Sequence, residues 1–297
     1  MFDYALFGNI VLTGLIVGTI YALMAVGITF IYSIMKMINW SMGEFYMLGS
    51  YAQYVLVAHV FGWERWYLAI PVAVAGVFVL GLAIQRWLLA PMYVGEAERR
   101  DEYATIVTVV LMVFFRNLAT VVAGPYVYSP REYLGPVTIG SLSVSGSRLV
   151  AVAGTLIILA LFYGVVKHTW IGMALRGTAQ NRVGVQTAGI RVRQMDQLAF
   201  GIGVGLAAAA GALLAPTFLV YPENGSLSTL KGFEIIVIGG LGSIPGSLIA
   251  ALLLGVVEKL GSVYLSPSYE HLYGFALLIL LLAARPNGLM GERERSA

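Results

Sequence analysis

Long apolar runs, separated by short polar stretches, make up most of the chain. They lie near residues 9–34, 42–61, 66–90, 104–123, 148–166, 198–220, 233–257 and 272–284. A helix needs about 20 mostly apolar residues to cross a bilayer. The pattern therefore predicts an all-α polytopic membrane protein, with about eight transmembrane or half-membrane helices in a single domain over residues 1–297.

The composition supports this class of protein. Only 11% of the residues are charged, whereas soluble domains have about 25%. The chain has no cysteine, and its three histidines lie far apart in the sequence. Disulfides and thiolate metal sites are therefore excluded, and we expect no cofactor. We find no nucleophile–base pair, which disfavours an integral membrane enzyme.

The polar connections differ in charge, and this predicts the topology. Segment 167–197 has five basic residues and one acidic residue, so the positive-inside rule places it in the cytoplasm. Segment 124–147 has one basic residue and is expected outside. There, alternating residues around Gly140 and Ser141 predict a small β-hairpin near 137–144. That hairpin is either an ordered loop or a docking surface for a soluble partner. Eight full spans would put both termini on one side, whereas a broken segment that dips into the membrane and returns would put them on opposite sides.

Two stretches that break helices interrupt the apolar pattern. Residues 239–247 (GGLGSIPGS) contain four glycines and a proline, which predicts a broken helix near 239–246. A break at membrane depth must be buried in protein or line a watery path, because unpaired backbone groups are not tolerated in hydrocarbon. Such breaks recur where transporters bind solute. Ser243 is expected to cap a half-helix with Pro245 in its first turn.

Residues 39–44 (NWSMGE) form the second predicted break, and Glu44 has two interpretations there. In the one we favour, Ser41 and Glu44 form a capping box, in which each side chain bonds the other residue's backbone amide. In the other, the carboxylate acts directly in solute passage or gating, because ionised groups inside a membrane are costly and usually functional. Arg116 is expected to snorkel to the outer surface rather than line a pathway.

A set of motifs extends over nearly the whole chain. The motifs are Gly18–Leu23, Ile38–Gly49, Gly172–Arg176, Ala188–Ile190, Gly239–Gly246 and the tail Arg285-Pro286-x-Gly288-Leu289-x-Gly291. Together they resemble the LivH/LivM-type permease subunits of ABC importers for branched-chain amino acids, closer to the LivH side. The family commonly has Asn-Phe-Ala-His/Gln-Gly where this chain has Asn-Trp-Ser-Met-Gly. Its members also carry other amino acids, urea, amides and small carboxylates.

The resemblance implies a permease of the bacterial inner membrane with several partners. These are a second homologous permease subunit, two cytoplasmic ATPase subunits and a periplasmic solute-binding protein. The chain lacks a Gly-x4-Gly-Lys-Ser/Thr phosphate-binding loop, so ATP hydrolysis is expected in the partners. The solute is expected to be a small polar molecule, such as a branched-chain or other amino acid, and no nucleic acid partner is expected. The alternative is a stand-alone secondary transporter or channel.

The candidate site residues form two groups. The translocation pathway is expected to involve Asn39, Ser41, Gly43, Glu44, Gly242, Ser243 and Pro245. Coupling to an ATPase is expected to involve Arg176, Thr178, Ala179, Asn181, Arg182, Val183, Ala188 and Gly189, within segment 167–197. The resemblance implies a coupling helix around Asn181. The alternative for this segment is a solvated basic loop that only fixes the topology.

Overall fold

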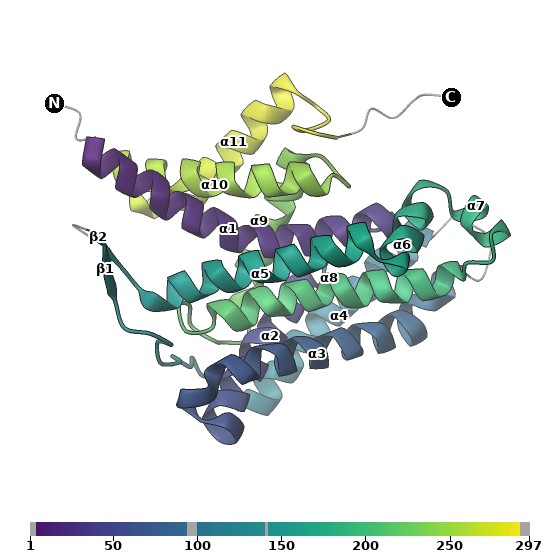
Figure 1. The fold of residues 1–297 in the computed structure, drawn as a ribbon, viewed down its shortest axis with the longest axis horizontal. Helices are drawn as coiled ribbons and strands as arrows, with labels where there is room; N and C mark the ends of the chain where they lie inside the picture. Colours follow the sequence, from purple (N-terminus) through teal and green to yellow (C-terminus); the bar gives the residue numbers. More distant parts are fainter. Residues whose placement is uncertain (1–3, 94–99, 140–141, 292–297) are drawn as a thin grey trace.

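The computed structural model describes residues 4–93, 100–139 and 142–291, which form eleven α-helices and one two-stranded sheet (Figure 1). The helices are α1 (Tyr4–Met35), α2 (Met42–Leu56), α3 (Trp66–Ile84), α4 (Arg100–Ala123), α5 (Gly146–His168), α6 (Trp170–Gln180), α7 (Arg182–Thr187), α8 (Val192–Leu214), α9 (Asn224–Gly239), α10 (Ile244–Tyr264) and α11 (Glu270–Ala284). The strands are β1 (Val137–Ile139) and β2 (Leu142–Val144).

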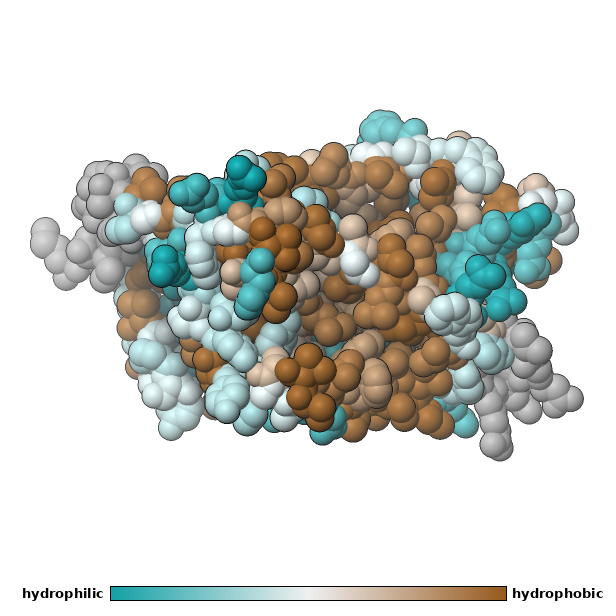
Figure 2. All heavy atoms as spheres, turned by 90° about the horizontal axis from the view of Figure 1, so that it is seen from below, coloured by the Kyte–Doolittle hydropathy of each residue, from teal (hydrophilic) through white to brown (hydrophobic). Residues whose placement is uncertain are grey.

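The helices build a membrane bundle, as the apolar pattern predicts. Among the described residues, seven helical segments are long and apolar enough to cross a bilayer, and they include α1, α3, α4, α5, α8, α10 and α11. The helices α2 and α9, with 15 and 16 residues, are not among these segments. Figure 2 shows a broad apolar surface between more polar ends of the molecule, which is the exterior that a bilayer requires.

Helix α8 forms the centre of the bundle, where α1, α2, α3 and α5 pack against it. Its small residues allow this close packing, because they let neighbouring backbones approach. The run Ala207–Ala210 is at most 1% exposed. A Cβ atom on Gly49 of α2 would overlap the carbonyl oxygen of Ala208, so only glycine fits at this crossing.

The apolar run 233–257 is not one broken span but a helical hairpin. Helix α9 ends at Gly239, helix α10 begins at Ile244, and Gly239 packs directly against Gly246. Between the helices, Gly240 has a φ of +97°, in the region that favours glycine. The predicted break is confirmed, but the chain reverses direction there and does not continue across the membrane.

The start of α10 has the predicted cap. The Ser243 hydroxyl accepts a hydrogen bond from the Gly246 amide at 3.2 Å, and Pro245 lies in the first turn. Proline suits that position because its missing N–H would have no partner there.

The α9–α10 turn lies beside the C-terminal end of α1, where a Cβ atom on Gly242 would be 3.8 Å from the Tyr32 ring. The chain near its end returns to this turn, because Leu289 donates a backbone hydrogen bond to Ile238 at 2.8 Å. The last described residues therefore lie at the opposite end of the bundle from Tyr4. Eight full spans would have put both termini on one side, but two helices occupy the run 233–257, so the termini lie at opposite ends, as expected if that broken segment returns.

The two ends of the bundle have different structural elements. Figure 1 shows β1 and β2 at the end where α1 begins, and α6 and α7 at the other end. Val137 pairs with Val144, and Ile139 with Leu142, where the hairpin was expected. Its turn, Gly140 and Ser141, lies outside the described residues. The basic segment that carries α6 and α7 marks the cytoplasmic end, so the sheet marks the external end.

Candidate functional site

A cavity of about 280 Å³ lies between α1, α2, α8, α9 and the segment that joins α8 to α9. We call it the outer cavity. Its polar side chains are those of Tyr21, Tyr46, Thr217, Tyr221, Asn224, Ser228 and Lys231. The rest of its wall is apolar, with Ile20, Met24 and Leu214 among its residues. Pockets of this kind bind small molecules by apolar contact and orient them through a few polar groups.

One side of the outer cavity lies beside segment 124–147. Phe218 and Leu219 in its wall are 51% and 50% exposed. The next residue, Val220, forms an antiparallel bridge with Tyr128, with backbone N–O distances of 2.8 and 2.9 Å. Tyr128 belongs to the external segment 124–147. This exposed part of the cavity wall is therefore beside the segment that the charge pattern assigns to the outside.

Lys231 lines the outer cavity and extends its ammonium group into a buried charged cluster. The ammonium nitrogen lies 2.8 Å from a carboxylate oxygen of Glu234 and 2.5 Å from one of Glu258. These three side chains are at most 4% exposed. The ring of Phe275 lies 5.8 Å from the ammonium group. The cluster thus links α9, α10 and α11, and its pairing offsets the large cost of burying each charge alone.

The sequence does not point to this cluster, because Lys231 and Glu258 flank the apolar run and look like its polar borders. The hairpin brings the two borders together. Lys231 is 8 residues before Gly239 and Glu258 is 12 residues after Gly246, so both lie two to three helical turns from the reversal. A glycine-rich turn with opposite charges at similar spacing on both sides is the signal that predicts such a pair.

Glu44 pairs with Arg116 and does not form the predicted capping box. Arg116 donates to Glu44 Oε1 at 3.2 Å and to the Ser226 hydroxyl at 2.7 Å. Ser41 occupies the N-cap position of α2 but makes no side-chain cap bond. Its hydroxyl and its amide both donate to Asn39 Oδ1, at 2.7 and 3.0 Å. The capping-box prediction is wrong because Glu44 Oε1 pairs with a cation from α4 and the Ser41 hydroxyl donates to the side-chain oxygen of Asn39.

Arg116 also does not snorkel to the outer surface, because its guanidinium group turns inward to this pair.

We expect Arg116→Met to destabilise the protein more than Glu44→Gln. The Glu44 side chain is 3% exposed and that of Arg116 is 33% exposed, so losing the cation strands a buried carboxylate. Breaking a buried pair costs about 3–5 kcal/mol, and the partial exposure of Arg116 reduces this to about 2 kcal/mol.

The melting temperature in detergent measures this difference. The double variant Glu44→Gln/Arg116→Met should recover most of the loss, because neither charge is then left unpaired. Equal losses in the two single variants, without recovery in the double variant, would contradict the pairing.

The other predicted pathway residues near Glu44 are buried around the start of α2. Asn39 and Ser41 are 1% and 0% exposed. Gly43 packs against Gly225 where α2 crosses α9. From α2, it is Tyr46 that lines the outer cavity. The 39–44 stretch therefore sets the position of α2 and of Tyr46 beside α9.

The second predicted pathway group lies at the other end of α9. Gly43 faces Gly225, whereas Gly242, Ser243 and Pro245 follow Gly239. From 225 to 239 the helix rises through 14 residues, which is about 21 Å at 1.5 Å per residue. The structure does not bring the two groups together. One group lies beside the outer cavity, and the other lies at the cytoplasmic end of the α9–α10 hairpin.

Segment 167–197 contains the short helices α6 and α7, in the region where the resemblance implied a coupling helix around Asn181. The Asn181 side chain accepts a hydrogen bond from the Gly184 amide at 2.8 Å and so caps α7. Gly189 follows α7 with a φ of +83°. Among the predicted coupling residues, Thr178 is buried and Ala179 is half-buried, whereas Arg176, Val183, Ala188 and Gly189 are exposed.

Arg182 attaches this segment to the bundle. Its guanidinium group donates to Asp196 near the start of α8 at 2.5 Å. It also donates to the carbonyl oxygen of Ile34 at the end of α1, at 2.9 Å. Arg182 therefore connects α7 to the end of α1 and to the start of α8.

The known proteins with sequences similar to this chain point to one family. The family described as the permease component of the branched-chain amino acid transport system matches residues 10–283. LivH of Escherichia coli K12, a high-affinity branched-chain amino acid transport system permease protein, is 31% identical over 294 residues, covering 95% of this chain and 94% of LivH. BraD of Pseudomonas aeruginosa, with the same description, is 30% identical over 300 residues, covering 95% and 94%. LivM of Escherichia coli K12 is 24% identical over 303 residues, covering 91% and 68%.

One solved structure, "PsaBC from Streptococcus pneumoniae in complex with Fab", has a similar fold. Its TM-score is 0.50 with 11% identity, covering 97% of this chain and 93% of that one. This likeness concerns the fold alone. The family match extends over nearly all of the bundle, and the identity to LivH exceeds that to LivM. The chain therefore belongs to the family of branched-chain amino acid transport system permease components and is more similar to LivH than to LivM.

Proposed function

We propose that a small amino acid enters this permease through the outer cavity, in an ATP-driven importer. The observation that carries the proposal is the outer cavity itself, which lies beside the segment assigned to the outside, combines hydroxyl and amide groups with an apolar wall, and has Lys231 in its lining. An aliphatic amino acid needs both kinds of contact. LivH and BraD are described as branched-chain amino acid permeases, which favours that class of solute.

The remaining pathway residues have supporting roles in this proposal. Asn39, Ser41, Gly43 and Glu44 hold α2 against α9, so that Tyr46 stays in the cavity wall. Gly242, Ser243 and Pro245 form the turn at the cytoplasmic end of the same hairpin, beside Tyr32 of α1. A solute that follows α9 inward would leave the protein near this turn.

Filling the outer cavity should stop uptake without unfolding the protein. We expect Ser228→Trp to reduce the uptake of radiolabelled leucine by at least tenfold, because an indole ring occupies much of a cavity of about 280 Å³. Leu230→Trp is the matched control, since Leu230 is on the same helix and is 51% exposed. Uptake is measured at equal membrane levels of each variant. Unchanged uptake in Ser228→Trp would mean that solute passes elsewhere.

We also propose that the chain works with the partners that its family implies. These are a second permease subunit, two ATPase subunits and a solute-binding protein. The exposed side chains of Val183 and Ala188 on and after α7 are available to an ATPase, and Arg182 transmits the movement to α1 and α8. The external segment beside the outer cavity is available to the binding protein.

Val183→Asp tests the coupling role of α7. Val183 is 69% exposed, so the change should leave insertion and thermal stability normal. In a contact with an ATPase it would bury an unpaired carboxylate, which costs several kcal/mol. We therefore expect loss of ATPase co-purification and of uptake. Leu265→Asp, at a residue that is 75% exposed after α10, is the control on the external side. Normal uptake by Val183→Asp would remove α7 from the coupling contact.

The sequence left a stand-alone secondary transporter open as an alternative, but the family match does not support it. The buried carboxylates of Glu234 and Glu258, where such a transporter could bind a coupling ion, are paired with Lys231. ATP dependence separates the two functions. Uptake by proteoliposomes that contain this chain alone, driven by an ion gradient, would support the secondary transporter.

A further inference from the structure

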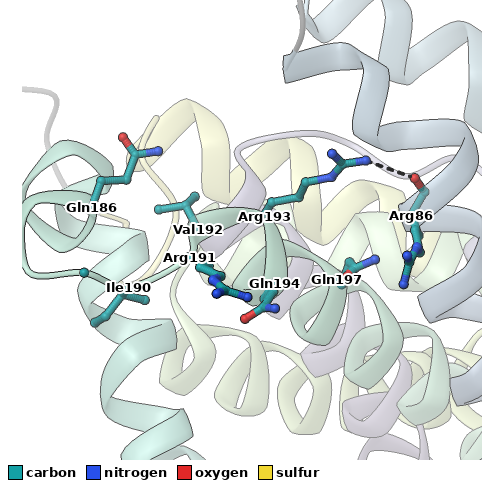
Figure 3. A pocket seen from close by; sticks show the side chains of 9 residues that line it. Arg86, Gln186, Ile190, Arg191, Val192, Arg193, Gln194 and Gln197 are labelled. Carbon is teal, nitrogen blue, oxygen red and sulfur yellow. Dashed lines mark hydrogen bonds between the residues drawn. The ribbon is translucent and has the colours of Figure 1, made fainter.

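A second cavity, with a volume of about 630 Å³, lies at the cytoplasmic end of the bundle (Figure 3). It is lined by three arginines and three glutamines, namely Arg86, Arg191, Arg193, Gln186, Gln194 and Gln197. None of the described residues that line it is acidic. We call it the basic cavity. Its side chains offer many N–H donors and three positive charges, so its chemistry favours a multivalent anion.

The side chains of the basic cavity come from parts of the chain that are far apart in sequence. Arg86 follows α3, whereas Arg193, Gln194 and Gln197 belong to the first turns of α8. Figure 3 shows the side chain of Arg193 extending to the backbone of Arg86, and its guanidinium group donates to that carbonyl oxygen at 3.5 Å. The exposed side chains of Arg86, Arg191 and Arg193 therefore lie around one cavity between α3 and α8.

The basic cavity lies near the ends of two apolar segments that are long enough to cross a bilayer. Arg86 belongs to the apolar segment Trp63–Met92, and Arg193 to Val192–Leu214, near the cytoplasmic end of each. Next to Arg86, Trp87 is 71% exposed and Leu88 is 39% exposed. Exposed tryptophan is typical of the level of lipid headgroups. An apolar surface for acyl chains thus adjoins a basic cavity.

We propose that the basic cavity binds the phosphate-bearing headgroup of an anionic phospholipid. Planar guanidinium groups match phosphate oxygens with paired hydrogen bonds, and the three glutamines add neutral donors. Basic pockets between helices at the cytoplasmic membrane surface are suited to such headgroups. Trp87 and Leu88 provide the apolar contact that a soluble anion would not use.

The bound headgroup would join the coupling segment to the bundle. Gln186 of α7 and Ile190 of the turn after α7 line one side of the cavity. Arg86, which follows α3, lines the other side. Arg182 is held by Asp196 and Ile34, so it is not required for the headgroup. The lipid would therefore be a second interaction that stabilises the position of α7, besides the contacts of Arg182 with Asp196 and Ile34. This binding does not depend on which solute the permease carries.

Native mass spectrometry of the purified full chain in detergent tests the site. The probes are phosphatidylglycerol, phosphatidylcholine with the same acyl chains, and inorganic phosphate as a competitor. We expect the chain to retain phosphatidylglycerol in preference to phosphatidylcholine. The variant Arg86→Gln/Arg191→Gln/Arg193→Gln should bind phosphatidylglycerol about 100-fold more weakly, from the loss of three charges near the surface. The control Arg131→Gln/Arg148→Gln/Arg285→Gln removes three exposed arginines elsewhere and should bind like the parent.

Three outcomes would overturn the proposal. The first is equal retention of the two lipids by the parent chain. The second is undiminished phosphatidylglycerol binding by the Arg86/Arg191/Arg193 variant. If that variant instead loses a co-purifying ATPase, the cavity is a contact site for a protein. The third is displacement of phosphatidylglycerol by millimolar phosphate, which would make it a site for a soluble anion. A normal melting temperature of each variant shows that it is folded.

Discussion

Replacing Lys231 with methionine is expected to lower the free energy of unfolding by about 3–5 kcal/mol, because two buried carboxylates then lose their shared cation. Glu234 and Glu258 are at most 2% exposed, and a methionine side chain offers neither of them a hydrogen bond or a positive charge. The expected result is a large fall in the melting temperature in detergent and a reduced level of protein in the membrane. It is the largest effect that we expect from a single side chain in this protein.

Lys259→Met is the matched control for Lys231→Met. Lys259 pairs with Glu270, but both side chains are 25% exposed, so the expected loss is small. The triple variant Lys231→Met/Glu234→Gln/Glu258→Gln removes all three charges and should regain most of the stability. If Lys231→Met and Lys259→Met have the same melting temperature, the cluster has no special role in stability.

The triple variant also separates stability from transport. If it folds but takes up no solute, then the charges act in passage as well as in packing. If it folds and transports normally, the cluster is a structural link between α9, α10 and α11.

Gly43→Ala is expected to destabilise the protein by about 3 kcal/mol, the upper part of the range for overpacking. A methyl group on Gly43 would overlap the Gly225 carbonyl oxygen and the Thr229 hydroxyl. The obstruction is mainly backbone, so α2 and α9 must move apart. Because Tyr46 follows Gly43 by one turn, the outer cavity should widen and uptake should fall with stability.

Gly76→Ala is the control for Gly43→Ala. Gly76 is also inside a helix, but nothing lies within 4 Å of an added Cβ atom. Alanine forms helices better than glycine, so this variant should be as stable as the parent or slightly more stable. Equal melting temperatures for Gly43→Ala and Gly76→Ala would show that the α2–α9 crossing tolerates a wider separation.

The helices themselves could be predicted from the sequence, because a bilayer imposes a simple rule on their length. The runs at 104–123 and 148–166 correspond closely to α4 (Arg100–Ala123) and α5 (Gly146–His168). The same rule failed at 233–257. This run is long enough for one crossing, but its residues belong to two antiparallel helices, α9 and α10. Hydrophobicity reports that a segment is buried or in lipid, but it does not report where the chain reverses.

The polar contacts were harder to predict, because they depend on which helices become neighbours. Ser41 and Glu44 fit a local capping pattern, yet Arg116 is 72 residues further along the chain and binds Glu44. The outer cavity draws on α1, α2, α8 and α9, and no local pattern identifies Tyr21 or Ser228 as its lining. Local motifs correctly predicted the Ser243 cap, where both partners lie within one helical turn.

The accessibility of a single cysteine at position 228 tests the central claim most directly. The chain contains no cysteine, so Ser228→Cys provides a unique thiol in the wall of the outer cavity. We predict that a membrane-impermeant maleimide labels it from the external side, and that leucine delivered by the solute-binding protein slows the labelling. A thiol at position 228 that reacts only from the cytoplasmic side, or at a rate that solute does not change, would contradict the account.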